Sequence, residues 1–566
     1  MKRLTIGLLV LFVATALVAG NGEKPEPQTI GGLTFADEYE LTIVNVIAHV
    51  NDKQGNSVTD LTKTDFEVYQ DGEKKELTNF QLYTEDVYEH YAEVRSKLPP
   101  EAPTPETTIE PRAVNIIIYI DNLNLHPLDR NRVLRSAGTF VRENLRPPVQ
   151  MMVVSFDKSL TILQPFTSKP GLVLDALRQV RTFSGGRPER EAARRGVLDR
   201  MKTEIENKGL GAGTSVRTTA AYADLLTYAH EETYNLAVSL DGLREVVTFL
   251  AGVEGRKSVL YISNGLAMVP GFDLFDAVSE SFNDPMILSE TQRFDRSPDF
   301  KSLVTAANSQ DVSFYTVGAG GLEVVGMSGN EYRMSRESMT TALGAESYLG
   351  SMRYMGDKTG GLAIVKTNDF EEGFKRIQKD LYTYYSLGYR LIPSGRDKMH
   401  RTEVKVPGHP EYVIRSRPSF VEKSLQTRVQ DRVLVALLQD LDENPMDLDA
   451  EIGAAAVTSN AFWMVPMSIS FPINMVALLP EGEDYVGRVV LFVATRDSNG
   501  KRSDTVIQEH EIRIPSNDYE LAMESRYGIG ASLLMTPGSY RIAIALMDQV
   551  TRQASYKTVN TTISSP

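Results

Sequence analysis

The most pronounced hydrophobic pattern of the chain is an apolar run at residues 114–121 that ends abruptly in polar residues. The run reads VNIIIYID, and its three consecutive isoleucines predict a strand that is buried on both faces. Asp121, Asn122 and Asn124 follow at the carboxyl end of that strand. In open α/β sheets ligands bind at this edge, so the pattern points first to a ligand or metal site there.

Strand and helix patterns alternate over residues 112–420. Further strands are predicted at 151–156, 160–166, 258–262, 312–317 and 358–365, and helices at 129–145, 169–183, 239–250, 300–309 and 370–381. This alternation predicts the α/β class, with a doubly wound parallel sheet. Two predicted insertions interrupt it, at residues 184–215 and 271–353. The first of them carries an amphipathic helical pattern with many arginines.

Antiparallel β patterns flank this region on both sides. Residues 33–86 hold short strand patterns separated by turns, which predict a small β module. Five prolines among Glu and Thr then predict an extended linker over residues 87–111. The strand-rich residues 421–566, with a DSNG hairpin signal at 497–500, predict a β-sandwich-like domain.

Composition and the N-terminus place the chain among exported proteins. Residues 1–20 combine Lys2 and Arg3 with an apolar stretch and the small residues Ala19 and Gly20, which predicts a signal peptide and a periplasmic or secreted protein. An uncleaved anchor is the alternative. No other stretch approaches eighteen apolar residues, so we expect no integral membrane segment after cleavage.

The charge and the cysteine count exclude several function classes. The 566 residues include 60 basic and 74 acidic ones, a net charge of −14, so no overall positive field recruits nucleic acid. The chain has no cysteine, which excludes disulfides, thiolate metal sites and a cysteine nucleophile.

The order of these motifs resembles that of a von Willebrand factor A domain, a Rossmann-like fold. The matching stretches are VNIIIYID, MMVVSF and VLYISNG. The chain is more specifically similar to the A-related domain proteins described from Acidobacteria. In those proteins a module like VNDKQGNSVTDLTKTDFEVYQDGEKKELTNF precedes the A domain, and a stretch like TGGLAIVKTNDFEEGFKRIQKDLYTYYSLGYRL closes it. The resemblance covers about residues 33–420 and implies the fold rather than a particular biochemistry.

The resemblance also implies a metal-ion-dependent adhesion site at the carboxyl edge of the sheet. A working site holds a divalent cation through an Asp-x-Ser-x-Ser motif, a threonine and a second aspartate. Asp121 matches the first position, but Leu123 and Leu125 replace both serines. Asn264 stands where the second aspartate is expected.

The ligand set that remains is therefore degenerate. Asn122 and Asn124 offer neutral oxygens out of register, and Thr214 or Thr218 could supply the threonine. Magnesium requires several oxygen ligands in near-octahedral geometry, and only one charged ligand survives here. We expect no cofactor, with a bound magnesium ion as the open alternative. The candidate site consists of Asp121, Asn122, Asn124, Thr214 and Asn264.

Catalytic motifs are lacking, which favours a binding function. The His230-Glu231-Glu232 stretch has no second histidine at zinc-helix spacing, and Ser155-x-x-Lys158 follows a strand where that nucleophile motif requires a helix start. We expect a non-enzymatic protein-binding or scaffold protein with an unidentified protein partner. A metal-dependent hydrolase using Asp121 and a structural component of an envelope assembly are the alternatives. The basic segment 178–208 is either a docking surface or a solvated helix.

Overall fold

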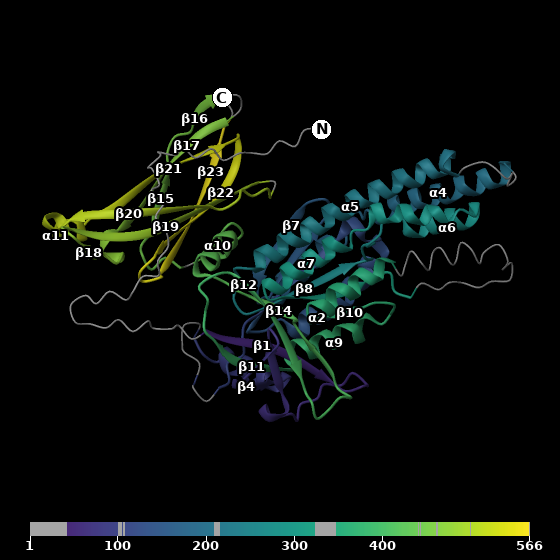
Figure 1. The fold of residues 1–566 in the computed structure, drawn as a ribbon, viewed down its shortest axis with the longest axis horizontal. Coiled ribbons are helices and arrows are strands. Elements are labelled where there is room, and N and C mark those ends of the chain that lie inside the picture. Colours follow the sequence, from purple (N-terminus) through teal and green to yellow (C-terminus); the bar gives the residue numbers. More distant parts are fainter. Residues whose placement is uncertain are drawn as a thin grey trace. The chain divides into compact units, whose positions relative to one another are not determined.

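The computed structural model describes residues 42–99, 105, 108–208, 216–322, 347–439, 441, 443–459, 462–498 and 500–564. The chain divides into two compact units (Figure 1). One comprises Ile43–Arg390 and Asp397–Glu422, and the other is built from Lys423–Pro566. The chain is mixed α/β, as predicted, with several antiparallel sheets and one sheet of mixed direction. The predicted signal peptide, residues 1–20, lies outside the described residues.

Strand β5 (Val114–Asp121) lies inside a six-stranded sheet with the order β10-β9-β8-β5-β6-β7. All eight of its residues are buried, because parallel neighbours flank it and helices cover both faces. The pairings from β10 to β6 are parallel, and β7 runs antiparallel to β6. The other strands are β6 (Val149–Phe156), β7 (Leu160–Thr167), β8 (Arg256–Ser263), β9 (Val312–Gly318) and β10 (Leu362–Ile364).

Successive residues of β5 point to opposite faces of the sheet and meet different helices. Ile116, Ile118 and Ile120 share a core with α2, α3 and α9. Tyr119 points the other way, where it contacts Phe156 and lies beneath α5, which packs with α7. The helices are α2 (Pro127–Asn144), α3 (Pro170–Val180), α5 (Ala220–Leu250), α7 (Ser297–Ser309) and α9 (Phe370–Tyr382).

Parts of the two predicted insertions form one helical extension, whereas α7 and β9, which fall within the predicted second insertion, belong to the sheet and its covering helices. Helix α4 (Arg187–Lys208), α6 (Phe272–Phe282) and the 3-10 helix η4 (Pro285–Phe294) pack on the first half of α5. Figure 1 shows α4, α5 and α6 running together away from the sheet. The extension has a core of its own, which includes Val197, Met201, Tyr222, Leu225, Leu274 and Phe275.

The strands of the small β module come from two parts of the chain, one before and one after the residues that form the parallel sheet. Its two sheets have the orders β13-β1-β11-β4 and β14-β12-β2-β3. The strands predicted over residues 33–86 therefore pair with residues 384–422, because a few short strands cannot bury an apolar face alone. The strands are β1 (Thr42–Asn51), β2 (Glu67–Gln70), β3 (Glu73–Lys75), β4 (Leu77–Tyr83), β11 (Tyr384–Leu391), β12 (Lys398–Lys405), β13 (Val413–Ser416) and β14 (Ser419–Glu422); a 3-10 helix, η1, spans Lys63–Asp65.

The extended linker predicted over residues 87–111 is wrong in its first part, where α1 (Glu85–Ser96) is a helix. Tyr88 and Tyr91 lie three residues apart on one face of it and are buried. The ring centroid of Tyr88 is 4.9 Å from that of Tyr382, and its hydroxyl is 3.0 Å from that of Tyr384. The prolines of the segment all follow α1, so they do not interrupt it.

The second compact unit contains two antiparallel sheets that share one hydrophobic core. One sheet combines β15, β16, β17 and β21, and the other combines β18, β19, β20, β22 and β23. Helix α10 packs on the outer face of the second sheet. The elements are α10 (Leu425–Ala436), β15 (Asp449–Ile452), β16 (Ala456–Ser459), β17 (Phe462–Pro472), β18 (Leu479–Glu481), β19 (Asp484–Asp497), β20 (Val506–Pro515), α11 (Tyr519–Met523), β21 (Arg526–Met535), β22 (Gly538–Asp548) and β23 (Ala554–Ile563).

Among the described residues, none of the helices combines the length and the apolar character that crossing a bilayer requires.

Buried charges connect the β module to the parallel sheet. Arg415 of β13 forms two hydrogen bonds to the Asp380 carboxylate of α9, at 2.7 and 2.6 Å. His49 of β1 lies 3.9 Å from the same carboxylate and 3.2 Å from the carbonyl oxygen of Thr383. Burial lowers the pKa of His49 to about 4, although Asp380 acts to raise it. His49 is therefore neutral near neutral pH.

Gly242→Ala is expected to destabilise the protein although alanine is the better helix former. A Cβ at residue 242 of α5 would lie 2.4 Å from the Phe156 ring and 2.8 Å from the Tyr119 hydroxyl. Both side chains are buried, so crowding of about 1–3 kcal/mol exceeds the helical gain of about 1 kcal/mol. The matched control is Gly196→Ala on α4, where a Cβ would meet no atom within 4 Å beyond the adjacent residues and backbone of its own helix, and the free energy of unfolding should rise. Urea unfolding followed by far-ultraviolet circular dichroism distinguishes the two.

The first unit is expected to lose stability as the pH falls from about 6.5 to about 4. His49 has a lower pKa in the folded protein than in the unfolded chain, so the unfolded chain takes up the proton first. Between about pH 7.5 and about pH 5 the loss should be about 2 kcal/mol. The groups facing His49 are Asp380, Arg415 and Arg256. His49→Gln should remove this part of the pH dependence, and an unchanged slope in that variant would contradict the assignment.

Candidate functional site

Asp121 ends β5 with both carboxylate oxygens already occupied by hydrogen-bond donors. The Asn124 side-chain amide donates to Oδ1 and Oδ2 at 3.0 and 2.8 Å, and the Asn124 backbone N–H donates to Oδ1 at 3.2 Å. The hydroxyls of Tyr261 and Ser263 donate to Oδ2. The residue is 1% exposed. Burial raises the pKa of Asp121, and the hydrogen bonds from Tyr261, Asn124 and Ser263 act against that rise.

Asn122 is turned away from Asp121, towards a buried arginine. Its side-chain oxygen accepts a hydrogen bond from Arg130 at 2.9 Å, and its amide donates to the Ser155 hydroxyl at 2.6 Å. Arg130 of α2 is fully buried and also donates to the carbonyl oxygens of Arg181 and Phe183. Asn122 therefore joins the end of β5 to the segment that follows α3.

A guanidinium group takes the position beside Asn124. Arg190 of α4 donates one N–H to the Asn124 side-chain oxygen and two to the Glu232 carboxylate, with Nε 2.6 Å from Oε1. The side chains of Arg190 and Glu232 are 12% and 4% exposed. Burial acts to lower the pKa of Arg190, but the Glu232 carboxylate outweighs it and the pKa is raised. A permanent positive charge from the first insertion therefore lies at the sheet edge.

Two glycines allow the insertion to lie on this edge. A Cβ at Gly185 would come within 2.3 Å of the Leu125 carbonyl oxygen, and one at Gly186 within 2.6 Å of the Leu123 carbonyl oxygen. The Gly186 N–H donates to the Asn122 carbonyl oxygen at 2.9 Å. Any larger residue at either position would lift the start of α4 away from the sheet.

The basic segment 178–208 turns several of its arginines inwards. Arg194 forms an ion pair of 2.6 Å with Asp273 of α6, and both side chains are largely buried. Arg187 bonds to Glu191, and its guanidinium lies 4.3 Å from the centroid of the Tyr348 ring. Tyr348 belongs to a helical stretch over residues 347–358. These arginines attach α4 to the extension and to the sheet edge.

The remaining predicted ligands do not converge on Asp121. The Asn264 amide donates to Asp129 at 3.0 Å, and its buried side-chain oxygen has no hydrogen-bond partner among the described residues. Leu123 and Leu125 are buried apolar residues. Thr214 lies outside the described residues. Of the five predicted site residues, the structure joins Asp121 to Asn124 by side-chain hydrogen bonds and Asn264 to Asn124 through a backbone N–H to carbonyl bond of 3.4 Å, while the side chains of Asn122 and Asn264 have other partners.

The described residues contain no group of three or more His, Asp or Glu side chains placed to hold a metal ion. The Asp121 oxygens, which the resemblance assigns to a metal, instead accept hydrogen bonds from protein N–H and O–H groups, whereas the buried Asn264 side-chain oxygen accepts none from the described residues. With Asp121 as the one carboxylate of the predicted set, and its oxygens already hydrogen-bonded, the residues described at this edge fit a divalent cation site poorly.

Arg190 and Glu232 were not among the predicted site residues, although each carries a signal in the sequence. Arg190 lies on the same helical face as Val197 and Met201, and Glu232 interrupts the stripe formed by Leu225, Ala229 and Leu236. A charged residue in an otherwise apolar stripe requires a partner of opposite charge when it is buried. Which two charges meet depends on the packing of α4 on α5.

The comparisons with known proteins leave the family open. No family model matches the sequence, and no curated protein matches it. Among solved structures, the X-ray structure of Northeast Structural Genomics Consortium target SoR45 is similar over 21% of this chain and 87% of that chain, with 12% sequence identity and a TM-score of 0.15. A similarity this weak carries no argument about the fold.

Arg190→Met is expected to lower the free energy of unfolding by about 3–5 kcal/mol, because it leaves the Glu232 carboxylate buried without its ion pair. Arg178→Met removes an exposed ion pair with Asp175 and should cost no more than about 1 kcal/mol. The double substitution Arg190→Met/Glu232→Leu should recover most of the loss. Urea unfolding of the three variants measures this, and equal midpoints for the two single variants would contradict it.

Proposed function

We propose that the protein is an exported, non-enzymatic protein-binding or scaffold protein. In this proposal the six-stranded sheet is a von Willebrand factor A-like domain with a degenerate metal-ion-dependent adhesion site. The observation that carries it is the guanidinium of Arg190, which bonds to Asn124 beside Asp121. A positive charge of the chain itself thus lies beside the residue that binds the Asp121 carboxylate, which the resemblance assigns to the cation.

The sheet supports this choice of fold. Its five parallel strands carry helices on both faces, and the antiparallel strand β7 forms an edge next to β6. The buried strand β5 ends in Asp121, the position that the resemblance assigns to the first metal ligand.

The state of Asp121 argues against the hydrolase alternative. A catalytic carboxylate must reach a substrate or an activated water molecule. Asp121 is 1% exposed, and its oxygens accept hydrogen bonds from Asn124, Tyr261 and Ser263. It functions here as a structural acceptor that fixes the end of β5.

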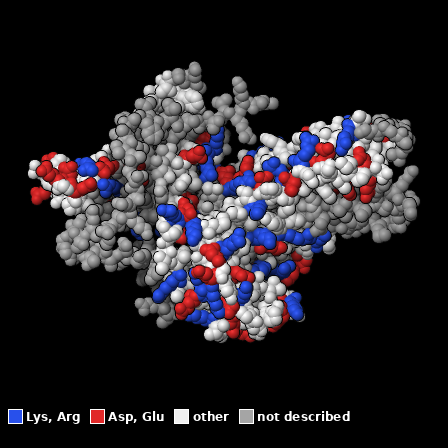
Figure 2. Space-filling view, in the orientation of Figure 1, with Lys and Arg blue, Asp and Glu red and all other residues white. Residues whose placement is uncertain are grey.

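A groove between α2 and α3 is the surface that we assign to the protein partner. Its volume is about 400 Å³, and its floor includes Leu134, Leu174 and Leu177. The basic residues around it are Arg135, Arg142, Arg178 and Arg181, and the only acidic residue that lines it is Glu371. An apolar floor with a basic rim complements an acidic segment with apolar anchors. Figure 2 shows mixed charges on the face in view, so a local groove rather than an overall field would select the partner.

The test is affinity capture of partners by the tagged mature protein from its native envelope. Arg135→Glu/Arg181→Glu should reduce recovery of the partner by about tenfold or more, because the substitutions place like charges against the acidic segment. The matched control Lys63→Glu/Lys301→Glu makes the same charge change at exposed positions outside the groove and should leave recovery unchanged.

Magnesium and EDTA provide the second arm of the test. The unmodified protein should recover the same amount of partner in magnesium as in EDTA, since the proposed degenerate site at Asp121 requires no cation for binding. Capture that requires magnesium would contradict the degenerate site, and equal capture by the groove variant would contradict the assigned surface.

A further inference from the structure

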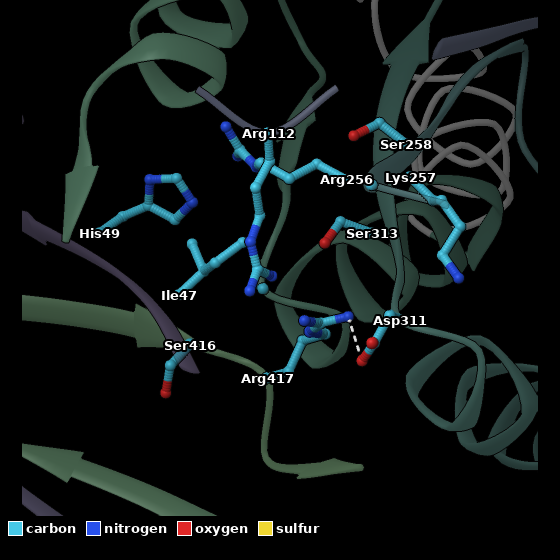
Figure 3. A pocket seen from close by; sticks show the side chains of 12 residues that line it. Ile47, His49, Arg112, Arg256, Lys257, Ser258, Asp311, Ser313, Ser416 and Arg417 are labelled. Atoms are coloured by element: carbon cyan, nitrogen blue, oxygen red, sulfur yellow. Dashed lines mark ion pairs between the residues drawn. The ribbon is translucent and has the colours of Figure 1, made fainter. Parts of the chain in front are cut away.

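A polar cavity lies at the amino edge of the parallel sheet, which is the edge opposite to the one that carries Asp121. Arg112 precedes β5, Arg256 begins β8, and Asp311 precedes β9, so the cavity is at the amino ends of these strands (Figure 3). Residues of the β module, among them His49 and Arg417, form its other wall. The cavity therefore lies where the β module meets the sheet, within one compact unit.

Positive charge predominates in the cavity walls. Arg112, Arg256, Lys257 and Arg417 line it, and Asp311 is the only acidic residue that does so. His49 adds no charge near neutral pH, because burial keeps its pKa at about 4. Like charges in a half-enclosed space repel one another more strongly than at an open surface. Such a site attracts an anion.

The arginines differ in how firmly the protein holds them. Arg256 donates to the carbonyl oxygens of Leu381 and Asp380, and its guanidinium lies 4.0 Å from the centroid of the Tyr384 ring. It is thus a fixed wall charge. Arg417 forms an ion pair of 2.7 Å with Asp311, whose side chain is 55% exposed.

Arg112 makes neither a hydrogen bond nor an ion pair with any residue of the described chain. Figure 3 shows its side chain extending through the cavity with the guanidinium directed towards Arg417. Its donors are therefore available to a ligand. Ser258 and Ser313 line the same space, and their hydroxyls add neutral donors.

The volume limits the ligand to a small ion. About 40 Å³ accommodates a group of a few heavy atoms, but not the body of an organic acid or a nucleotide. Arginine forks and hydroxyl donors match the several oxygens of a tetrahedral anion, and a double negative charge suits several cations.

We propose that this cavity is a binding site for a tetrahedral oxyanion of the phosphate class, held by the guanidinium groups of Arg112 and Arg417 and by the serine hydroxyls. The bound ion joins Arg112 of the parallel sheet to Arg417 of the β module and so stabilises the first unit. The source of the ion is inorganic phosphate or the phosphate group of a phosphomonoester. This proposal is independent of the protein-binding function and of the edge at Asp121.

The test is thermal unfolding of the full mature chain with two probes. Far-ultraviolet circular dichroism follows the first unit, which holds the long helices, and fluorescence of the single tryptophan, Trp463, follows the second unit. Millimolar inorganic phosphate should raise the melting temperature of the first unit by about 3 °C or more over chloride at equal ionic strength, since a ligand of the native state stabilises it. Phosphate also stabilises proteins nonspecifically, so the second unit serves as the internal reference.

Arg112→Gln should abolish the phosphate-dependent rise while leaving the melting temperature without phosphate nearly unchanged, because Arg112 has no hydrogen bond or ion pair to lose among the described residues. Arg135→Gln in the groove between α2 and α3 is the matched control and should keep the full rise. The proposal would be overturned if phosphate raised the melting temperatures of both units equally, or if it raised them no more than chloride does. A full phosphate-dependent rise in Arg112→Gln would also overturn it.

Two further ligands identify the source and the class. A rise with phosphoethanolamine equal to that with inorganic phosphate supports a phosphomonoester, and a rise with inorganic phosphate alone supports the free ion. An equal rise with acetate would overturn the assignment to the phosphate class.

Discussion

The central constraint on this structure is that carboxylates buried at one edge of a sheet require donors from elsewhere in the chain. Asp121 and Glu232 are almost fully buried, and an unpaired charge in such a place would cost several kcal/mol. Tyr261, Ser263 and Asn124 satisfy Asp121, and Arg190 satisfies Glu232. Because Arg190 lies on α4, neutralising the edge also fixes the helical extension against the sheet.

A closed carboxyl edge changes which surfaces of the α/β unit are available for binding. The edge that usually carries ligands in such sheets is occupied by α4 and its arginines. The groove between α2 and α3, with its apolar floor, and the cavity at the amino edge both carry several basic side chains. Both favour negatively charged ligands, although the chain as a whole carries a net charge of −14.

Periodicity predicted the α/β class and most strand positions, because buried strands such as β5 and β6 are short and continuously apolar. The strand predicted at 358–365 shrinks to Leu362–Ile364, because a helix extends to residue 358. Periodicity predicted only the last third of α5, since Glu232 and the many polar residues before it obscure the helical stripe. The helix α1 was missed because the prolines of residues 87–111 predicted an extended linker, although Tyr88 and Tyr91 have helical spacing. At the candidate site, sequence spacing identified Asp121 and Asn124, but pairings such as Arg190 with Glu232 arise only when distant helices pack.

The arrangement of the β module has a consequence for how the protein is made. Its strands β1–β4 and β11–β14 are separated by the whole parallel sheet, yet Tyr83 at the end of β4 pairs with Tyr384 at the start of β11. The intervening segment is thus a nested domain whose two ends meet. During vectorial synthesis the first strands emerge long before their partners, with open edges that invite wrong pairing. The edge strand β3 (Glu73–Lys75) consists of charged residues only, and charged edge strands disfavour wrong pairing.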